Sequence, residues 1–156
     1  MSQRVLSAAV FAVALTASAQ PVFADVTRGV ISAFRGQFVV TKDDLPEGKN
    51  DRDTISKIKA AQLKSVEGTA KGDVQAWTFH YTAFLTKTGA NHLKVEFLNG
   101  NKLAADQQLD GVDPKSVVLT GDINIDEDEG LAKGKTYSVQ VLNGSSVVAK
   151  TSLTMK

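Results

Sequence analysis

Bulky and polar side chains alternate with a period of two from Val74 to Thr86. The aromatic residues Trp77, Phe79 and Tyr81 fall on one face of this segment, and small or polar side chains occupy most of the other face. A period of two is typical of a β-strand that buries one face. Phe84 departs from the pattern because it lies on the polar face, so we expect it to contact the N-terminal segment or a partner.

Shorter apolar segments bounded by turn residues predict further strands. They are Gly36 to Thr41, His92 to Leu98, Lys102 to Leu109, Ser116 to Asp126, Thr136 to Leu142 and Ser146 to Met155. Asn99-Gly100 and Asn143-Gly144 predict tight hairpins, because a type I′ turn needs positive φ at both central residues. The segment from Gly68 to Asp73 is predicted as a turn.

One helix is predicted from Asp51 to Ala61. Ile55 and Ile58 fall on one side of it at a three-residue step. Either Asp51 or Asp53 can accept hydrogen bonds from the free N–H groups at its start. The pattern leaves open whether residues 51–66 are all helical or form a helix followed by a strand.

Together these elements predict a mainly β protein. The expected fold is a single antiparallel β-sandwich of about seven strands, over residues 36–156, with one short N-terminal helix. Regularly spaced turns and the absence of alternating strands and helices favour this fold class over an α/β fold.

The segment Leu131 to Val141 resembles the tyrosine-corner region of fibronectin type III and related immunoglobulin-like domains. In those domains a tyrosine near the start of the penultimate strand bonds back to the backbone. The resemblance implies that Tyr137 takes this role, with Leu131 packed beneath it and Gly134 at the bend, and that Trp77 is the core tryptophan. It therefore implies an immunoglobulin-like sandwich, and it implies nothing about activity.

The N-terminal segment has the features of a secretory signal peptide. Arg4 precedes an apolar run from Val5 to Ala17, and small residues end at Ala24. The sequence predicts that residues 1–24 are removed by cleavage between Ala24 and Asp25, and that 25–35 form a linker. The run is shorter than the ~20 residues of a membrane span, so we expect a secreted or periplasmic mature protein without a span.

Composition excludes several classes of function. The chain has 18 basic and 17 acidic residues, and Arg4 leaves with the leader, so the mature chain carries 17 of each. A neutral balance disfavours nucleic-acid binding, which needs a basic surface. The absence of cysteine excludes a thiol nucleophile, a thiolate metal site and a disulfide.

An acidic cluster is the most suggestive chemical feature. Asp122, Asn124, Asp126 and Asp128 project oxygen ligands of the kind that calcium prefers. The alternative interpretation is a solvated acidic turn that keeps an exposed strand from pairing with a neighbour. Calcium is accordingly the one cofactor hypothesis, and no other cofactor is predicted.

No catalytic motif is found, so the chain is predicted not to be an enzyme. The sequence lacks a nucleophile elbow and a phosphate-binding glycine loop. His80 and His92 are the only histidines, and strand geometry places them too far apart to share a metal. A carboxylate pair formed in three dimensions remains open, and His80 buried against a carboxylate inside a cleft would favour it.

The leading functional hypothesis is an exported, non-catalytic binding or structural module. It would act in the periplasm, the cell envelope or the extracellular space, on an unknown protein or an envelope glycan. One alternative is a calcium-stabilised structural or adhesion domain. The other is a small hydrolase with a carboxylate site that sequence motifs do not reveal.

Overall fold

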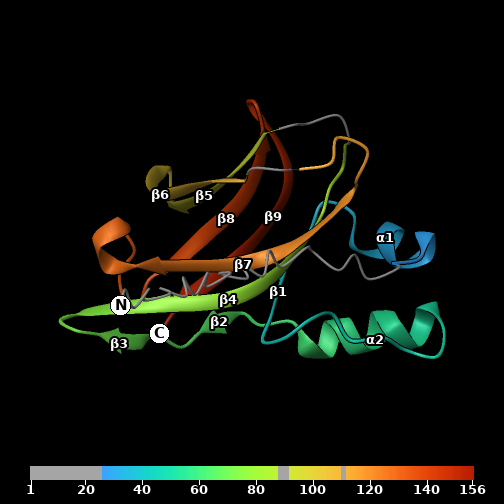
Figure 1. Ribbon diagram of the computed structural model, residues 1–156, viewed down its shortest axis with the longest axis horizontal. Helices are drawn as coiled ribbons and strands as arrows, with labels where there is room; N and C mark the ends of the chain where they lie inside the picture. The colour runs from blue at the N-terminus through green and yellow to red at the C-terminus, as the bar shows by residue number, and fades with distance from the viewer. Residues whose placement is uncertain (1–25, 88–91, 110–111) are drawn as a thin grey trace, which may run out of the picture.

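The protein is a mainly β, immunoglobulin-like sandwich of two sheets with two helices against one of them (Figure 1). The computed structural model describes residues 26–87, 92–109 and 112–156. The predicted signal peptide 1–24 and its cleavage site lie outside the described residues.

Nine strands, two α-helices and one 3₁₀-helix make up the described chain. In order they are α1 (Arg28–Phe34), β1 (Phe38–Thr41), α2 (Asp51–Ala61), β2 (Ser65–Val66), β3 (Thr69–Lys71), β4 (Val74–Phe84), β5 (Leu93–Asn99), β6 (Lys102–Leu109), β7 (Val118–Asp126), η1 (Glu127–Glu129), β8 (Thr136–Asn143) and β9 (Ser146–Met155). In this part of the chain, neither helix has the length and apolar character needed to cross a membrane.

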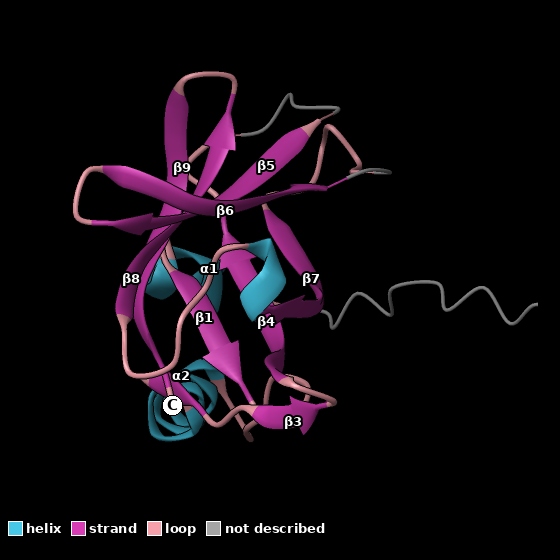
Figure 2. Ribbon diagram, turned by 90° about the vertical axis from the view of Figure 1, so that its left-hand side faces the viewer, coloured by secondary structure: helices cyan, strands magenta, loops and turns pink. Residues whose placement is uncertain are grey.

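The first sheet is built around β4. β7 pairs with one side of β4, and β1 and β3 pair with different halves of the other side, all antiparallel. The second sheet has the order β2-β9-β8-β5-β6. Its pairings are antiparallel except for β2 with β9. The two sheets lie face to face in both ribbon views (Figure 1 and Figure 2).

Most predicted elements are present, with differences at the N-terminal third. α2, β6 and β9 have the predicted bounds. The helix ends at Ala61 and is followed by β2 at Ser65–Val66, which resolves the choice left open for residues 51–66. The predicted turn from Gly68 to Asp73 instead contains β3, an exposed strand that pairs with the start of β4.

The predicted linker 25–35 contains a second helix, α1, so the expectation of a single helix is wrong. The Thr27 side chain caps α1 by accepting a hydrogen bond from the Val30 N–H. Val30 and Phe34 lie one turn apart and are both buried. A single buried pair in seven residues is too short a signal for helical periodicity to be recognised.

Asn50, and neither of the two predicted aspartates, caps α2. Its side chain accepts a hydrogen bond from the Asp53 N–H at 3.0 Å. Asp53 instead accepts from the Lys49 N–H at 2.9 Å, and this hydrogen bond, with the nearby Lys57, holds the pKa of Asp53 below its usual value. Asn50 therefore caps the N-terminus of α2 in the way predicted for Asp51 or Asp53.

Both predicted hairpins occur, with a different turn type. Asn99 pairs with Lys102, so the central residues of the first turn are Gly100 and Asn101. Gly100 has φ +62, and no described residue other than glycine has positive φ. One glycine at the first central position fits a type II′ turn and not the predicted type I′. The β8–β9 hairpin repeats this arrangement, with φ +61 at Gly144.

The apolar residues form two clusters. The larger lies between the sheets and includes Trp77, which is fully buried. The smaller lies between the helices and the outer face of the β4 sheet, where Phe34 stacks on Phe84 with ring centroids 5.3 Å apart. Val30, Val39 and Ile58 are its other buried members. Phe84 thus contacts the N-terminal segment, as its position on the polar face of β4 suggests.

Gly36 joins the two sheets. Its N–H donates to the Phe84 carbonyl in one sheet at 2.7 Å, and its own carbonyl accepts from the Lys150 N–H in the other at 3.0 Å. These opposed bonds need φ +79, a conformation that glycine adopts without strain. The peptide at Gly36 thereby fixes where α1 ends and where β1 starts.

A tyrosine corner is present at the start of β8. The Tyr137 hydroxyl accepts a hydrogen bond from the Ala132 N–H at 2.8 Å, and Tyr137 and Leu131 are buried. Gly134 turns the chain with φ +79 between them. This is the arrangement implied by the resemblance of this segment to immunoglobulin-like domains.

Replacing Tyr137 by phenylalanine should lower the free energy of unfolding by about 1 kcal/mol or somewhat more, because the half-buried Ala132 N–H loses its acceptor. Chemical denaturation of the two proteins measures this difference. Tyr81→Phe is the matched control, since Tyr81 is also buried but its hydroxyl makes no hydrogen bond with a described residue. Equal losses in the two variants would contradict a structural role for the Tyr137 hydroxyl.

Replacing Phe34 by alanine should destabilise the protein by roughly 3–5 kcal/mol, because Phe34 is 1% exposed and stacks on Phe84. Ile31→Ala, on the half-buried side of α1, is the control and should cost clearly less. Thermal melts and limited proteolysis near residue 28 would report the two effects. An unchanged melt of Phe34→Ala would mean that α1 does not belong to the cooperative fold.

Candidate binding surface

The helices leave part of the outer face of the β4 sheet uncovered. We call this part the polar strip and define it by five residues: Asp44, Thr78, His80, Asp122 and Asn124. Thr78 and His80 are alternate residues of β4, so they share the outer face. β7 places Asn124 opposite Thr78, and Asp122 opposite His80. Asp44 comes from the loop between β1 and α2.

Hydrogen bonds and ion contacts connect the polar strip across the strands. The Thr78 hydroxyl donates to Asn124 Oδ1 at 3.3 Å. His80 Nδ1 lies 2.9 Å from Asp122 Oδ1, and His80 Nε2 lies 3.5 Å from Asp44 Oδ1. The strip is therefore a set of preoriented polar groups on rigid strands.

His80 is the most enclosed member of the strip. Its side chain is 13% exposed, whereas those of Asp122 and Asp44 are 76% and 99% exposed. Each ring nitrogen faces a carboxylate, and no hydroxyl of a described residue is hydrogen-bonded to the ring. The pair with Asp122 resembles the base and orienting group of a hydrolase, but a nucleophile in contact is required as well.

Tyr81 lies beneath the strip, on the inner face of β4. Burial, with the negative charge of Asp122 nearby, raises the pKa of Tyr81 to about 12. Its ring stacks on Phe38, with centroids 4.9 Å apart. Gly121 faces it from β7, where a Cβ atom would approach the Tyr81 hydroxyl to 3.0 Å. The tyrosine is therefore a neutral core residue, and Gly121 leaves space for its hydroxyl.

The carboxylates that follow the strip satisfy backbone groups. Asp126 Oδ1 accepts from the Asp128 N–H at 3.1 Å, and Glu129 Oε2 accepts from the Asp126 N–H at 2.9 Å, which forms a capping box around η1. Glu127 Oε2 accepts from the Gln75 N–H at 2.9 Å. These acidic residues therefore define the end of β7 and its connection to β4.

The four residues predicted to bind calcium do not converge. Asp122 contacts His80, Asn124 contacts Thr78, and Asp126 caps η1. Within residues 26–87, 92–109 and 112–156, no three His, Cys, Asp or Glu side chains are grouped so that they could hold a metal ion. The two histidines are separated as expected, because His80 lies in one sheet and His92 precedes β5 in the other.

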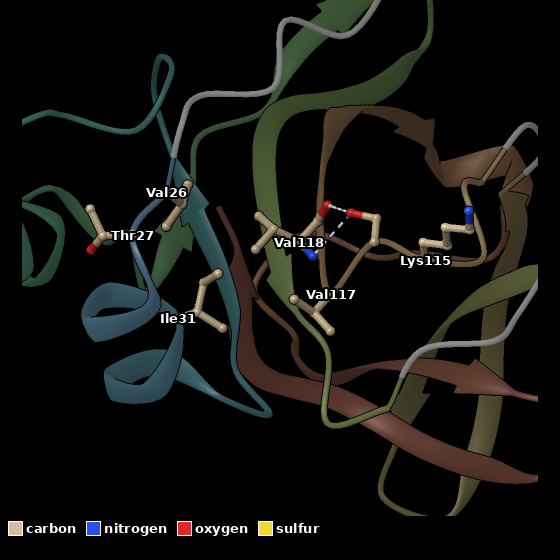
Figure 3. Close-up of a pocket in the computed structure, with 7 residues that line it drawn as sticks. Val26, Thr27, Ile31, Lys115, Val117 and Val118 are labelled. Atoms are coloured by element: carbon tan, nitrogen blue, oxygen red, sulfur yellow. Dashed lines mark hydrogen bonds between the residues drawn. The ribbon is translucent and has the colours of Figure 1, made fainter.

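A pocket lies near the start of β7, away from the strip (Figure 3). Its volume is about 440 Å³, and it is open to solvent. The apolar part of its lining consists of Val26, Ile31, Val117 and Val118. The polar part consists of Thr27, Lys115 and Ser116. His80 and its carboxylates are not among the residues that line this pocket. The structure therefore contains the histidine–carboxylate pair that would favour an enzyme but does not place it in this pocket.

Sequence reasoning assigned Asp122 and Asn124 to an outward strand face but did not connect them with His80 and Thr78. The connection requires knowing that β7 pairs with β4, although two other strands lie between them in the chain. Asp44 was missed as well, since its contact with His80 depends on a loop. The only available signal was the shared outward phase of the two strands.

Comparison with known proteins adds a single structural similarity. No family model matches the chain, and no curated protein matches it. Among solved structures, an immunoglobulin-like protein from Pseudomonas aeruginosa is similar over 77% of this chain and 90% of its own, with 13% sequence identity and a TM-score of 0.39. The immunoglobulin-like character of the fold lies in its strand order and its tyrosine corner.

Calcium should leave the melting temperature unchanged to within about 1 °C relative to excess chelator, because the carboxylates of η1 already accept backbone hydrogen bonds. Asp126→Ala should lower stability by about 1 kcal/mol in both conditions, as loss of a cap does. Differential scanning calorimetry with and without millimolar calcium measures both effects. A rise of several degrees that Asp126→Ala abolishes would contradict this expectation and support the calcium hypothesis.

Proposed function

We propose that this chain is an exported, non-catalytic binding module whose binding surface is the polar strip. The observation that carries the proposal is the cross-strand arrangement of His80 between Asp122 and Asp44, with Thr78 bonded to Asn124 beside it. Donors and acceptors fixed on rigid strands lose little conformational entropy when a partner binds. This makes them a better recognition surface than mobile loops would be.

The burial pattern of the sheet supports the same surface. α1 and α2 cover the outer face of β4 where Thr82 and Phe84 lie, and both residues are fully buried. The part that carries the strip has no such cover from the described chain and presents Asp122 and Asn124 to solvent. Polar side chains are thus concentrated where the sheet is accessible.

The hydrolase alternative has weaker support than binding. Both His80 nitrogens face carboxylates, so the ring is oriented without a reacting group beside it. The pocket is lined mainly by valine and isoleucine, and a general base has to reach its substrate within hydrogen-bonding distance. The strip therefore favours recognition over proton transfer.

The leader supports the proposed export. Arg4 and the apolar run from Val5 to Ala17 have the organisation of a cleavable signal peptide. Cleavage between Ala24 and Asp25 would leave α1, which begins at Arg28, within the mature domain. The proposed compartment is the periplasm, the cell envelope or the extracellular space.

The partner class, protein or envelope glycan, can be tested by photo-crosslinking in the producing cell. A photoreactive residue at Asn124 should yield a discrete adduct on exported protein that begins at Asp25. The same residue at Gln108, an exposed position on the other sheet, should yield none. Fractionation and N-terminal sequencing verify the compartment. Equal labelling at both positions, or an unprocessed cytoplasmic chain, would contradict the proposal.

A further inference from the structure

Among the described strands, β7 forms one margin of its sheet and pairs with β4 alone (Figure 2). The Leu85 N–H donates to the Val117 carbonyl at 2.7 Å, which marks this pair as a hydrogen-bonded one. Bonded pairs alternate along an antiparallel ladder, so every second residue of β7 turns its backbone groups away from β4. These residues are Val118, Thr120, Asp122, Asn124 and Asp126.

Side chains satisfy the edge at both ends of β7. The Ser116 hydroxyl donates to the Val118 carbonyl at 2.6 Å and accepts from the Val118 N–H at 3.3 Å. At the other end, the Asp126 N–H donates to Glu129 at 2.9 Å. Self-capping of this kind limits how far another strand can extend along the edge.

Between these caps, the outward N–H and C=O groups of Thr120, Asp122 and Asn124 have no hydrogen-bond partner among the described residues. Three alternate residues expose six main-chain groups in the spacing of a β-ladder. We propose that this stretch, which we call the open edge, binds an extended, lysine- or arginine-rich segment of another protein as an added antiparallel strand. This inference rests on the proposed binding function and names its surface and partner chemistry.

Charge determines which strand the open edge can accept. Asp122 is 76% exposed beside the edge, and Asp44 is 99% exposed across the strip. Lys71 lies 3.7 Å from Asp126, close to the capped end. A second copy pairing through β7 would bring acidic side chains together, and like charges on facing strands destabilise a sheet. A basic segment would instead neutralise them.

The free edge of the other sheet is a poorer acceptor. β6 is the last strand of the other sheet, but the backbone of Gly130 packs against the Ala104 carbonyl. The connection between η1 and β8 therefore covers part of β6. The open edge of β7 has no comparable cover from the described chain.

The test measures binding of a synthetic nine-residue peptide of alternating lysine and threonine, with a glutamate–threonine peptide as the charge control. Thr120→Pro removes one outward N–H but no bond to β4, so it should weaken binding of the lysine peptide about tenfold or more. Asp122→Lys should do the same through charge. Asp106→Lys, an equal charge change on exposed β6, is the matched control and should stay within about twofold.

Amide exchange of the wild-type protein provides a measurement that does not depend on a variant folding. The lysine peptide should slow exchange at Thr120, Asp122 and Asn124, and leave the amides of β6 unchanged. Binding should weaken as salt rises, because exposed charges are screened.

Three outcomes in vitro would overturn the proposal: equal binding of both peptides, unaltered binding by folded Thr120→Pro, or a dimer formed through β7. A Thr120→Pro protein that still gives the Asn124 crosslinked adduct in cells would also overturn the open edge as the site. That last result would leave the proposed binding function intact, whereas loss of any adduct from the wild-type protein would remove the function itself.

Discussion

The different burial of the two ends of β4 is the constraint on which the rest of the structure depends. Its C-terminal end is buried on both faces: Ala83 faces the sandwich core, while Thr82 and Phe84 are covered from outside by the helices. Towards its N-terminal end the same strand buries Trp77 and Phe79 inside but presents Thr78 outward to solvent. One strand therefore supports a core, a helical layer and an accessible polar face.

That division explains why α1 and α2 are needed. A sheet with bulky apolar groups on both faces has to cover both. Phe84 on β4, Val39 on β1 and the nearby Val118 on β7 make the outer face apolar at one end. The helices cover this end, and the loop that joins β1 to α2 carries Asp44 to His80. The helical layer thus supplies one member of the strip as well as covering the apolar end.

Local periodicity was sufficient to predict most of the fold. β9 and α2 are predictable because each carries its own pattern of facing residues over at least two turns or several alternations. β6 is predictable mainly because it follows the Asn99-Gly100 hairpin signal. The tyrosine corner is predictable because Tyr137 and its bend lie within a few residues of each other. β3 and α1 are not, since three exposed residues and one buried pair contain too little pattern to be distinguished from a turn or a linker.

The candidate site was predictable only in part. Asp122 and Asn124 stood out as outward polar residues, and the interpretation that they discourage strand pairing came from the same alternation. Their contacts with His80 and Thr78 depend on which strand lies beside β7. That choice is made by burial of the whole core, and no short segment encodes it. The sequence also does not indicate that Ser116 closes the edge, because this role depends on hydrogen bonds to the backbone of Val118.

The acidic side chains of β7 can prevent self-association and attract a basic partner at the same time, because the same negative charge has both effects. An open β-edge attracts any extended chain through its backbone groups, which are the same in every protein. Selectivity therefore has to come from the side chains beside the edge and from the length left open. Asp122 repels a second acidic copy and attracts a basic strand with the same charge, while Ser116 and Glu129 restrict pairing to Thr120, Asp122 and Asn124. A short acidic edge is stable against self-association for the same reason that it is selective for a cationic partner.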